Sequence, residues 1–113
     1  MAISVLIADD HTIVREGLRL ILESSGEATV VAEANNGLEA VHLTRQQKPD
    51  VILMDIAMPS MNGIAATERI HEEFPAVAIV ILSMQSTLED IYRALRAGAT
   101  GYLMKESAGT EVV

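Results

Sequence analysis

Charged or hydroxyl side chains directly follow four apolar segments of this chain: Asp9 and Asp10, Asp55, Ser83, and Lys105. Three carboxylates together would supply oxygen ligands for a hard divalent cation, and such a set suits Mg²⁺ or Mn²⁺ better than zinc. An ammonium and a hydroxyl beside that cation could neutralise and hydrogen-bond phosphoryl oxygens, while one carboxylate attacks phosphorus and forms an acyl phosphate. These residue types therefore indicate phosphoryl transfer.

The apolar segments that precede these residues have the length and β-branched content of buried strands. Apolar residues recur at helical spacing between them, as in the interval 37–47, and Gly26, Pro49, Pro75 and Gly98 mark helix ends. We expect strands at 3–8, 29–34, 51–54, 77–82 and 101–104. Regular alternation of strand and helix predicts a parallel sheet with right-handed crossovers and helices on both faces. Ligands bind such sheets beyond the carboxyl ends of the strands, where the polar residues lie.

Each polar residue has a plain structural interpretation when it is taken alone. An Asp or Ser after a strand is often a cap or turn residue, and a single Lys is usually a solvated charge. Structural roles do not easily explain three acids at one edge of the sheet. Two carboxylates about 4 Å apart repel by roughly 4 kcal/mol at an effective dielectric near 20. We therefore expect a bound cation. Pro59 and Gly63 are interpreted as structural: Pro59 stiffens the loop after Asp55 and Gly63 permits the turn into the next helix.

Composition restricts the class of protein. The 113 residues fit one domain, and the absence of cysteine excludes disulfides, thiolate nucleophiles and Cys-based zinc sites. A net charge of −8 argues against direct binding to nucleic acid or to an anionic membrane surface. No apolar run approaches the roughly 20 residues of a membrane span, and the N-terminus does not read as a leader. We expect a cytoplasmic protein.

Four motifs resemble receiver domains of bacterial two-component response regulators along essentially the whole chain. They are VLIADDH at the paired acids, VILMDIAMPSMNG around Asp55, ILS at Ser83 and GYLMK at Lys105. The resemblance implies a flavodoxin-like, doubly wound α/β fold with a five-stranded parallel sheet in the order 2-1-3-4-5. It further implies a signalling phosphoacceptor that catalyses only its own phosphorylation and dephosphorylation.

The resemblance also assigns roles at the acidic end. Asp55 would accept the phosphoryl group from a phosphohistidine of a sensor histidine kinase. Asp10, the Asp55 carboxylate and the backbone carbonyl of Ala57 would bind Mg²⁺, and Asp9 would complete the metal shell through water.

Three further residues would transmit the modification. Ser83 resembles the switch hydroxyl, Lys105 the cation that pairs with the phosphoryl group, and Tyr102 the switch aromatic. Their movement would alter the surface near the fourth helix and fifth strand. For Tyr102, a half-buried packing role is an equal alternative.

The segment SMQ at 83–85 and the pair Lys105–Glu106 resemble the NarL/FixJ (LuxR-type) subfamily of transcription regulators, whose C-terminal helix-turn-helix domain binds DNA. We expect residues 1–113 to be a C-terminally truncated receiver domain, without the output domain and most of the fifth helix. Exposed apolar surface could then produce a homodimer. Many receivers have proline where this chain has Glu106, so a cis or trans Lys105–Glu106 bond stays open.

Other functions remain to be weighed. A phosphatase on a similar sheet would have D-x-D where this chain has Asp9-Asp10-His11. A cobalamin module would need D-x-H-x-x-G, but Val14 replaces the glycine, and His11 is interpreted as an exposed residue at the start of the first helix. A pseudoreceiver would lack one of the acids or the lysine. A stand-alone receiver that acts through protein–protein contacts is the main alternative.

Overall fold

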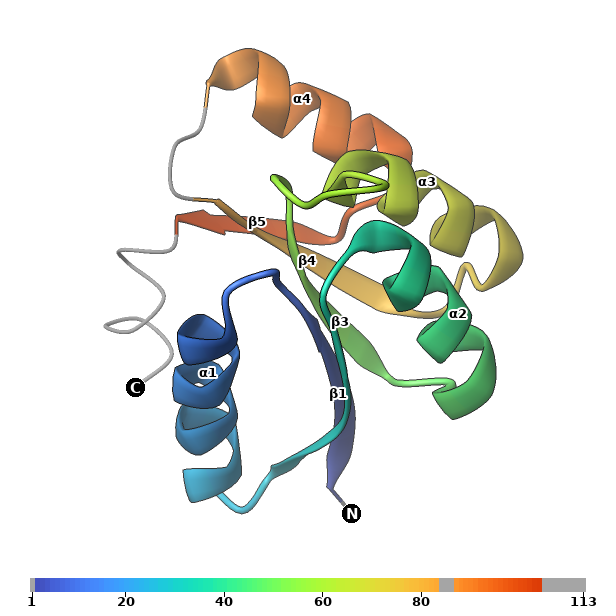
Figure 1. Cartoon of the computed structure of the whole chain (residues 1–113). Coiled ribbons are helices and arrows are strands. Elements are labelled where there is room, and N and C mark those ends of the chain that lie inside the picture. The colour runs from blue at the N-terminus through green and yellow to red at the C-terminus, as the bar shows by residue number, and fades with distance from the viewer. Residues whose placement is uncertain (1, 84–86, 105–113) are drawn as a thin grey trace.

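A parallel sheet of five strands in the order β2-β1-β3-β4-β5 forms the centre of the molecule. The computed structural model describes residues 2–83 and 87–104 of the chain (Figure 1). The described elements alternate along the chain: β1 (Ile3–Ala8), α1 (Thr12–Ser24), β2 (Ala28–Ala34), α2 (Gly37–Gln47), β3 (Val51–Asp55), α3 (Gly63–Glu73), β4 (Ala78–Ser83), α4 (Leu88–Ala97) and β5 (Gly101–Met104). The predicted strand order is confirmed.

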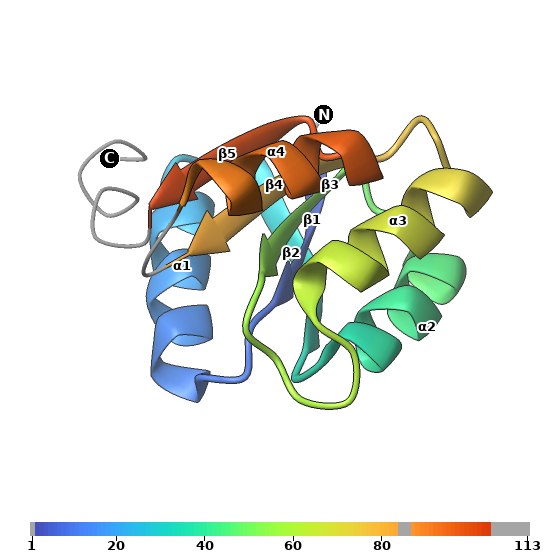
Figure 2. The same cartoon turned by 90° about the horizontal axis from the view of Figure 1, so that it is seen from above.

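Helices cover both faces of the sheet, as the alternation predicts. Figure 2 shows α1 on one side of the strands and α2 and α3 on the other. Helix α3 contacts both α2 and α4, so these three helices form a row. Between the sheet and this row lies the larger apolar cluster, in which Ile52, Ile79 and Ile81 are fully buried. A smaller cluster around Ile7 and Leu18 packs under α1.

The register brings the carboxyl ends of the central strands together. In β1, Ala8 pairs with Ala34 of β2 on one side and with Met54 of β3 on the other. The Asp9 amide donates to the Ala34 carbonyl at 3.0 Å and so continues the pairing by one residue. Asp9 therefore leaves β1 beside the end of β3, where Asp55 is the last strand residue.

Polar side chains begin three of the four helices in the described ranges. Asn36, Asn62 and Thr87 are N-caps that accept a backbone hydrogen bond from the third residue after them. His11 begins α1 without a side-chain cap. Gly98 ends α4 with a φ of 116°, in agreement with its predicted role.

Element bounds differ from the predicted ones by one residue at several ends. Strand β2 begins at Ala28 instead of 29, and β3 and β4 extend to Asp55 and Ser83. Both polar residues therefore still belong to the ladder, because backbone pairing continues after the apolar run stops. None of the helices within the described ranges has the length and apolarity needed to cross a membrane.

Candidate functional site

The acidic residues at the ends of β1 and β3 lie together, as predicted. One potential ligand atom from each of Asp9, Asp10, His11 and Asp55 lies within 4.8 Å of the others. Asp9 and Asp55 are buried, with 1 % and 4 % of their surface exposed, whereas the side chain of Asp10 is 32 % exposed. The group therefore has one buried carboxylate directly after β1, another at the end of the adjacent strand β3, and an open side at Asp10.

His11 belongs to this group, although the sequence suggested only an exposed residue at the helix start. Its side chain is indeed 64 % exposed, but its Nδ1 lies 3.1 Å from an oxygen of Asp9 and 3.1 Å from an oxygen of Asp10. The His11 amide also donates to Asp9 Oδ1 at 2.9 Å. The signal for this contact was its position directly after two acids, where the chain turns sharply from β1 into α1.

A second residue that the sequence did not point out is Arg15, on the first turns of α1. Its Nη1 donates to the backbone carbonyl of Asp9, and its Nε lies 3.1 Å from Glu33 Oε1 on β2. Only 11 % of the Arg15 side chain is exposed. A nearly buried cation thus contacts the backbone of the acidic turn.

The loop after Asp55 is held by close backbone contacts at two glycines. A Cβ on Gly63 would lie 2.0 Å from the Asp55 carbonyl oxygen, and one on Gly37 would lie 2.2 Å from the Met61 carbonyl oxygen. The Gly63 amide donates to the Ile56 carbonyl at 2.8 Å. Gly63 begins α3 at the turn into this helix, where the sequence placed it. The positive φ in the loop belongs to Ser60, at 67°, so Gly63 is required for the close approach.

The structure describes three of the other predicted site residues, Ser83, Ala57 and Tyr102, but not Lys105. Ser83 is buried at the end of β4, one residue after Leu82, the register partner of Asp55. Ala57 lies in the exposed bend after β3. Tyr102 is half-buried on β5 and packs against the larger apolar cluster. Strand β5 ends at Met104, so Lys105 and the Lys105–Glu106 bond lie outside the described residues. The roles assigned to these residues stay predictions.

The donor set fits a divalent cation. Carboxylate oxygens are the preferred protein ligands of Mg²⁺, which binds through one or two carboxylates and keeps several waters. Asp55 and Asp10 can provide the carboxylates, and the open side at Asp10 leaves room for water. Without a cation, three carboxylates would repel one another at close range.

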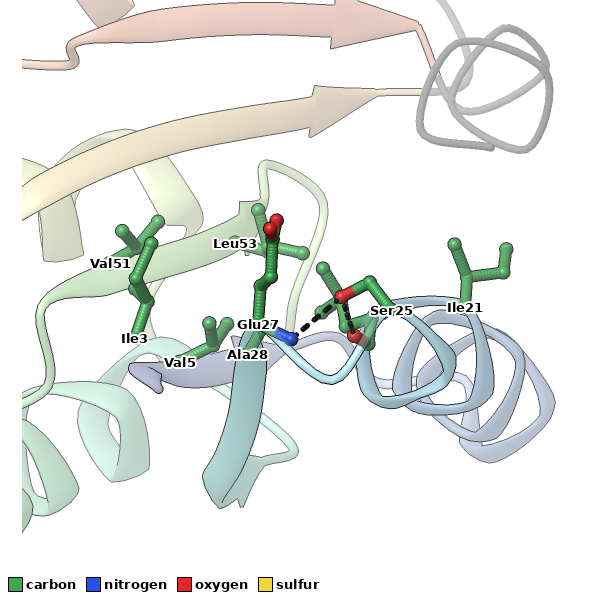
Figure 3. A pocket seen from close by; sticks show the side chains of 9 residues that line it. Ile3, Val5, Ile21, Ser25, Glu27, Ala28, Val51 and Leu53 are labelled. Atoms are coloured by element: carbon green, nitrogen blue, oxygen red, sulfur yellow. Dashed lines mark hydrogen bonds between the residues drawn. The ribbon is translucent and has the colours of Figure 1, made fainter. Parts of the chain in front are cut away.

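A separate apolar pocket lies near the amino ends of the strands, between α1 and the sheet (Figure 3). Its lining includes Ile3, Val5 and Leu53 from the sheet and Ile21 from α1. Its lining includes none of Asp9, Asp10 and Asp55, which lie at the other ends of β1 and β3. The pocket is therefore distinct from the acidic site.

Comparisons with known proteins agree with this geometry. The model of the response regulator receiver domain matches residues 5–113. The transcriptional regulatory protein YhcZ of Bacillus subtilis is 41 % identical over 96 % of this chain and 51 % of its own length. The chain thus spans about half the length of the curated relatives it matches.

Solved structures show the same fold. The receiver domain of the response regulator NarL from Mycobacterium tuberculosis superposes with a TM-score of 0.93 at 35 % identity, over 99 % of this chain and 90 % of that one. A chain of the CheX–CheY–BeF3–Mg²⁺ complex from Borrelia burgdorferi gives a TM-score of 0.90 at 26 % identity, over 97 % and 83 %. The chain therefore belongs to the family of response regulator receiver domains.

Proposed function

We propose that Asp55 accepts a phosphoryl group from a phosphohistidine of a sensor histidine kinase, in a reaction that depends on Mg²⁺. The observation that carries this proposal is that Asp9 and Asp10, which follow β1, each have a carboxylate oxygen within 4.8 Å of one from Asp55 at the end of β3. Buried carboxylates from separate segments are costly to bring together unless a cation offsets their charge. A phosphoacceptor site gives a reason for such an arrangement.

In the proposed step, an Asp55 carboxylate oxygen forms a bond to phosphorus while the bond from phosphorus to the imidazole nitrogen of the donor breaks. The electron pair of that bond returns to the imidazole, whose other ring nitrogen carries a proton, so an acyl phosphate and a neutral histidine remain. Mg²⁺, when bound, neutralises charge on the phosphoryl oxygens. Asp10, the Ala57 carbonyl and Asp55 would hold it, with Asp9 acting through water, and Mn²⁺ could replace it.

Ser83 and Lys105 complete the proposed chemistry. Ser83 is the residue after the register partner of Asp55, so its hydroxyl is suited to donate to a phosphoryl oxygen. Lys105 would pair with the same group as a cation. A chain similar to this one occurs in a solved complex that contains BeF3 and Mg²⁺, and this supports the proposal.

The modification would alter the surface near α4 and β5, through Ser83 and Tyr102. Relatives named as transcriptional regulatory proteins are about twice as long as this chain, so we infer that the domain controls an output segment that acts in transcription. A helix-turn-helix DNA-binding domain is the expected output, and residues 1–113 would be the receiver part alone. The fragment itself would bind no DNA. A cytoplasmic location and a possible homodimer belong to the same proposal.

Incubation with acetyl phosphate and Mg²⁺, followed by intact-protein mass spectrometry, tests the nucleophile. The wild-type chain should gain one phosphoryl group, and both EDTA and the Asp55→Asn substitution should prevent the gain. Asp90→Asn, in the first turn of α4, is the matched control and should label like wild type. Equal labelling of the Asp55→Asn variant would show that another residue is the acceptor.

A further inference from the structure

We propose that Arg15 is a positioning residue for the metal-binding turn: it holds the Asp9 backbone so that Asp9 and Asp10 keep the spacing a divalent cation requires. This inference rests on the proposed function, because it concerns the same Mg²⁺ site. Arg15 does not touch the cation or the phosphoryl group. It acts through the carbonyl of Asp9.

The Arg15 guanidinium makes several contacts around the turn. Nη1 donates to the Asp9 carbonyl, Nε lies 3.1 Å from Glu33 Oε1, and Nη2 donates to Thr12 Oγ1 at 3.4 Å. Because only 11 % of the side chain is exposed, these contacts are poorly replaced by water. The planar guanidinium can satisfy the carbonyl and the carboxylate together in one fixed geometry.

The contact with Arg15 adds a second hydrogen bond to the backbone of Asp9. Its amide donates to the Ala34 carbonyl at 3.0 Å, and its carbonyl accepts from Arg15, so both polar backbone groups of the residue are held. The next residues leave β1 and enter α1 at Thr12. Carboxylate repulsion favours opening of this short turn when no cation is bound. A bond from α1 back to Asp9 opposes that opening.

A purely structural role for the Arg15–Glu33 ion pair is the plain alternative, and Arg19 provides the matched comparison. Arg19 also bonds to Glu33, and its other described partner is Glu23, so it shares the carboxylate but not the contact with Asp9. Whether the loss of Arg15 raises or lowers the Mg²⁺ affinity also separates the two roles. Removal of a nearby positive charge alone would strengthen Mg²⁺ binding, whereas loss of positioning would weaken it.

The test is calorimetric titration of MgCl2 into wild type, Arg15→Met, Arg15→Lys and Arg19→Met, after circular dichroism confirms folding. Methionine retains the apolar stem and removes the donors. Arg15→Met should bind Mg²⁺ about tenfold more weakly, as is common when a residue that orients a ligand is lost. Arg15→Lys keeps the charge but cannot reproduce both contacts, so it should lose about threefold. Arg19→Met should stay within about twofold of wild type.

Labelling by acetyl phosphate gives a readout that general damage to the fold would not reproduce. At saturating Mg²⁺, the Arg15 variants should label at close to the wild-type rate, because only the metal affinity is changed. Unchanged or tighter Mg²⁺ binding by Arg15→Met overturns the proposal, as does an equal loss in Arg19→Met. If Arg15→Met does not fold, wild-type affinity in Arg15→Lys overturns it instead. If wild type binds Mg²⁺ but is not labelled at Asp55, the proposed function fails while the Arg15 result stands.

Discussion

Gly63 lies against Asp55 so closely that a Cβ on Gly63 would be 2.0 Å from the Asp55 carbonyl oxygen. The first residue of α3 therefore packs directly on the backbone of the proposed phosphoacceptor. No L-amino-acid side chain fits between them without movement of one backbone segment. The position of Asp55 thus depends on a glycine that carries no chemistry itself.

Gly63→Ala should destabilise the fold by about 1–3 kcal/mol, because the methyl group must displace the Asp55 backbone or α3. It should also slow labelling by acetyl phosphate, since the displaced backbone belongs to the acceptor. Urea denaturation and mass spectrometry measure the two effects. Gly17→Ala is the control: apart from its chain neighbours and the nearby backbone of α1, no atom of the described residues lies within 4 Å of its Cβ position, so it should stabilise by roughly 0.5–1 kcal/mol. A Gly63→Ala variant as stable as Gly17→Ala would contradict the close contact.

Mg²⁺ should stabilise the wild-type chain, because it binds the folded acidic site and not the unfolded chain. At a concentration about a hundred times its Kd, the gain in unfolding free energy should be about 2.7 kcal/mol. Asp10→Asn should show a much smaller gain. Without metal, the variant should be at least as stable as wild type, since one repelling charge is removed from the cluster. Thermal unfolding with Mg²⁺ and with EDTA measures both, and the same Mg²⁺ response in the two proteins would exclude Asp10 as a ligand.

The Tyr102 hydroxyl on β5 offers a test of stability that is independent of the phosphoryl chemistry. Its hydroxyl oxygen is buried and has no hydrogen-bond partner among the described residues. A buried hydroxyl without a partner costs about 1–3 kcal/mol, so Tyr102→Phe should be equal to or more stable than wild type. Labelling at Asp55 should be unchanged. A clear loss of stability in chemical denaturation would show that the hydroxyl is hydrogen-bonded.

Ser83→Ala should separate phosphoryl chemistry from metal binding. The hydroxyl is buried at the end of β4 and is proposed to donate to a phosphoryl oxygen. Its removal should slow labelling at saturating Mg²⁺ by roughly tenfold or more, because a preorganised donor is lost. The Mg²⁺ affinity should remain close to that of wild type. Ser24→Ala on α1, which removes a hydroxyl that bonds only to Ile21 in the described structure, is the control and should label normally.

The sequence predicted the strands and their common polar edge because both depend on local patterns. The apolar run 3–8 coincides with β1, and the acids that follow it lie beside Asp55 as the rule for parallel sheets requires. Burial on both faces of the sheet makes such runs continuous and easy to recognise. Strand ends were less certain, since Asp55 and Ser83 still belong to their strands although they are polar.

Contacts between segments could not be predicted in the same way. The bond from Arg15 to the Asp9 carbonyl depends on the angle at which α1 leaves β1, and periodicity carries no information on this angle. The approach of Gly37 to Met61 joins α2 to the loop after β3, and only the assembled helices place them together. The prediction that His11 is exposed is correct, but it did not include the contacts of Nδ1 with the Asp9 and Asp10 carboxylates.

The loop after Asp55 is fixed at two points, and this affects how the unmodified and phosphorylated domains can be superposed. Its backbone contacts Gly37 at the start of α2 and Gly63 at the start of α3. Residues 55–63 can therefore serve as the reference frame on which unmodified and modified forms are superposed. Displacements of α4 and β5 could then be measured relative to the backbone that carries Asp55.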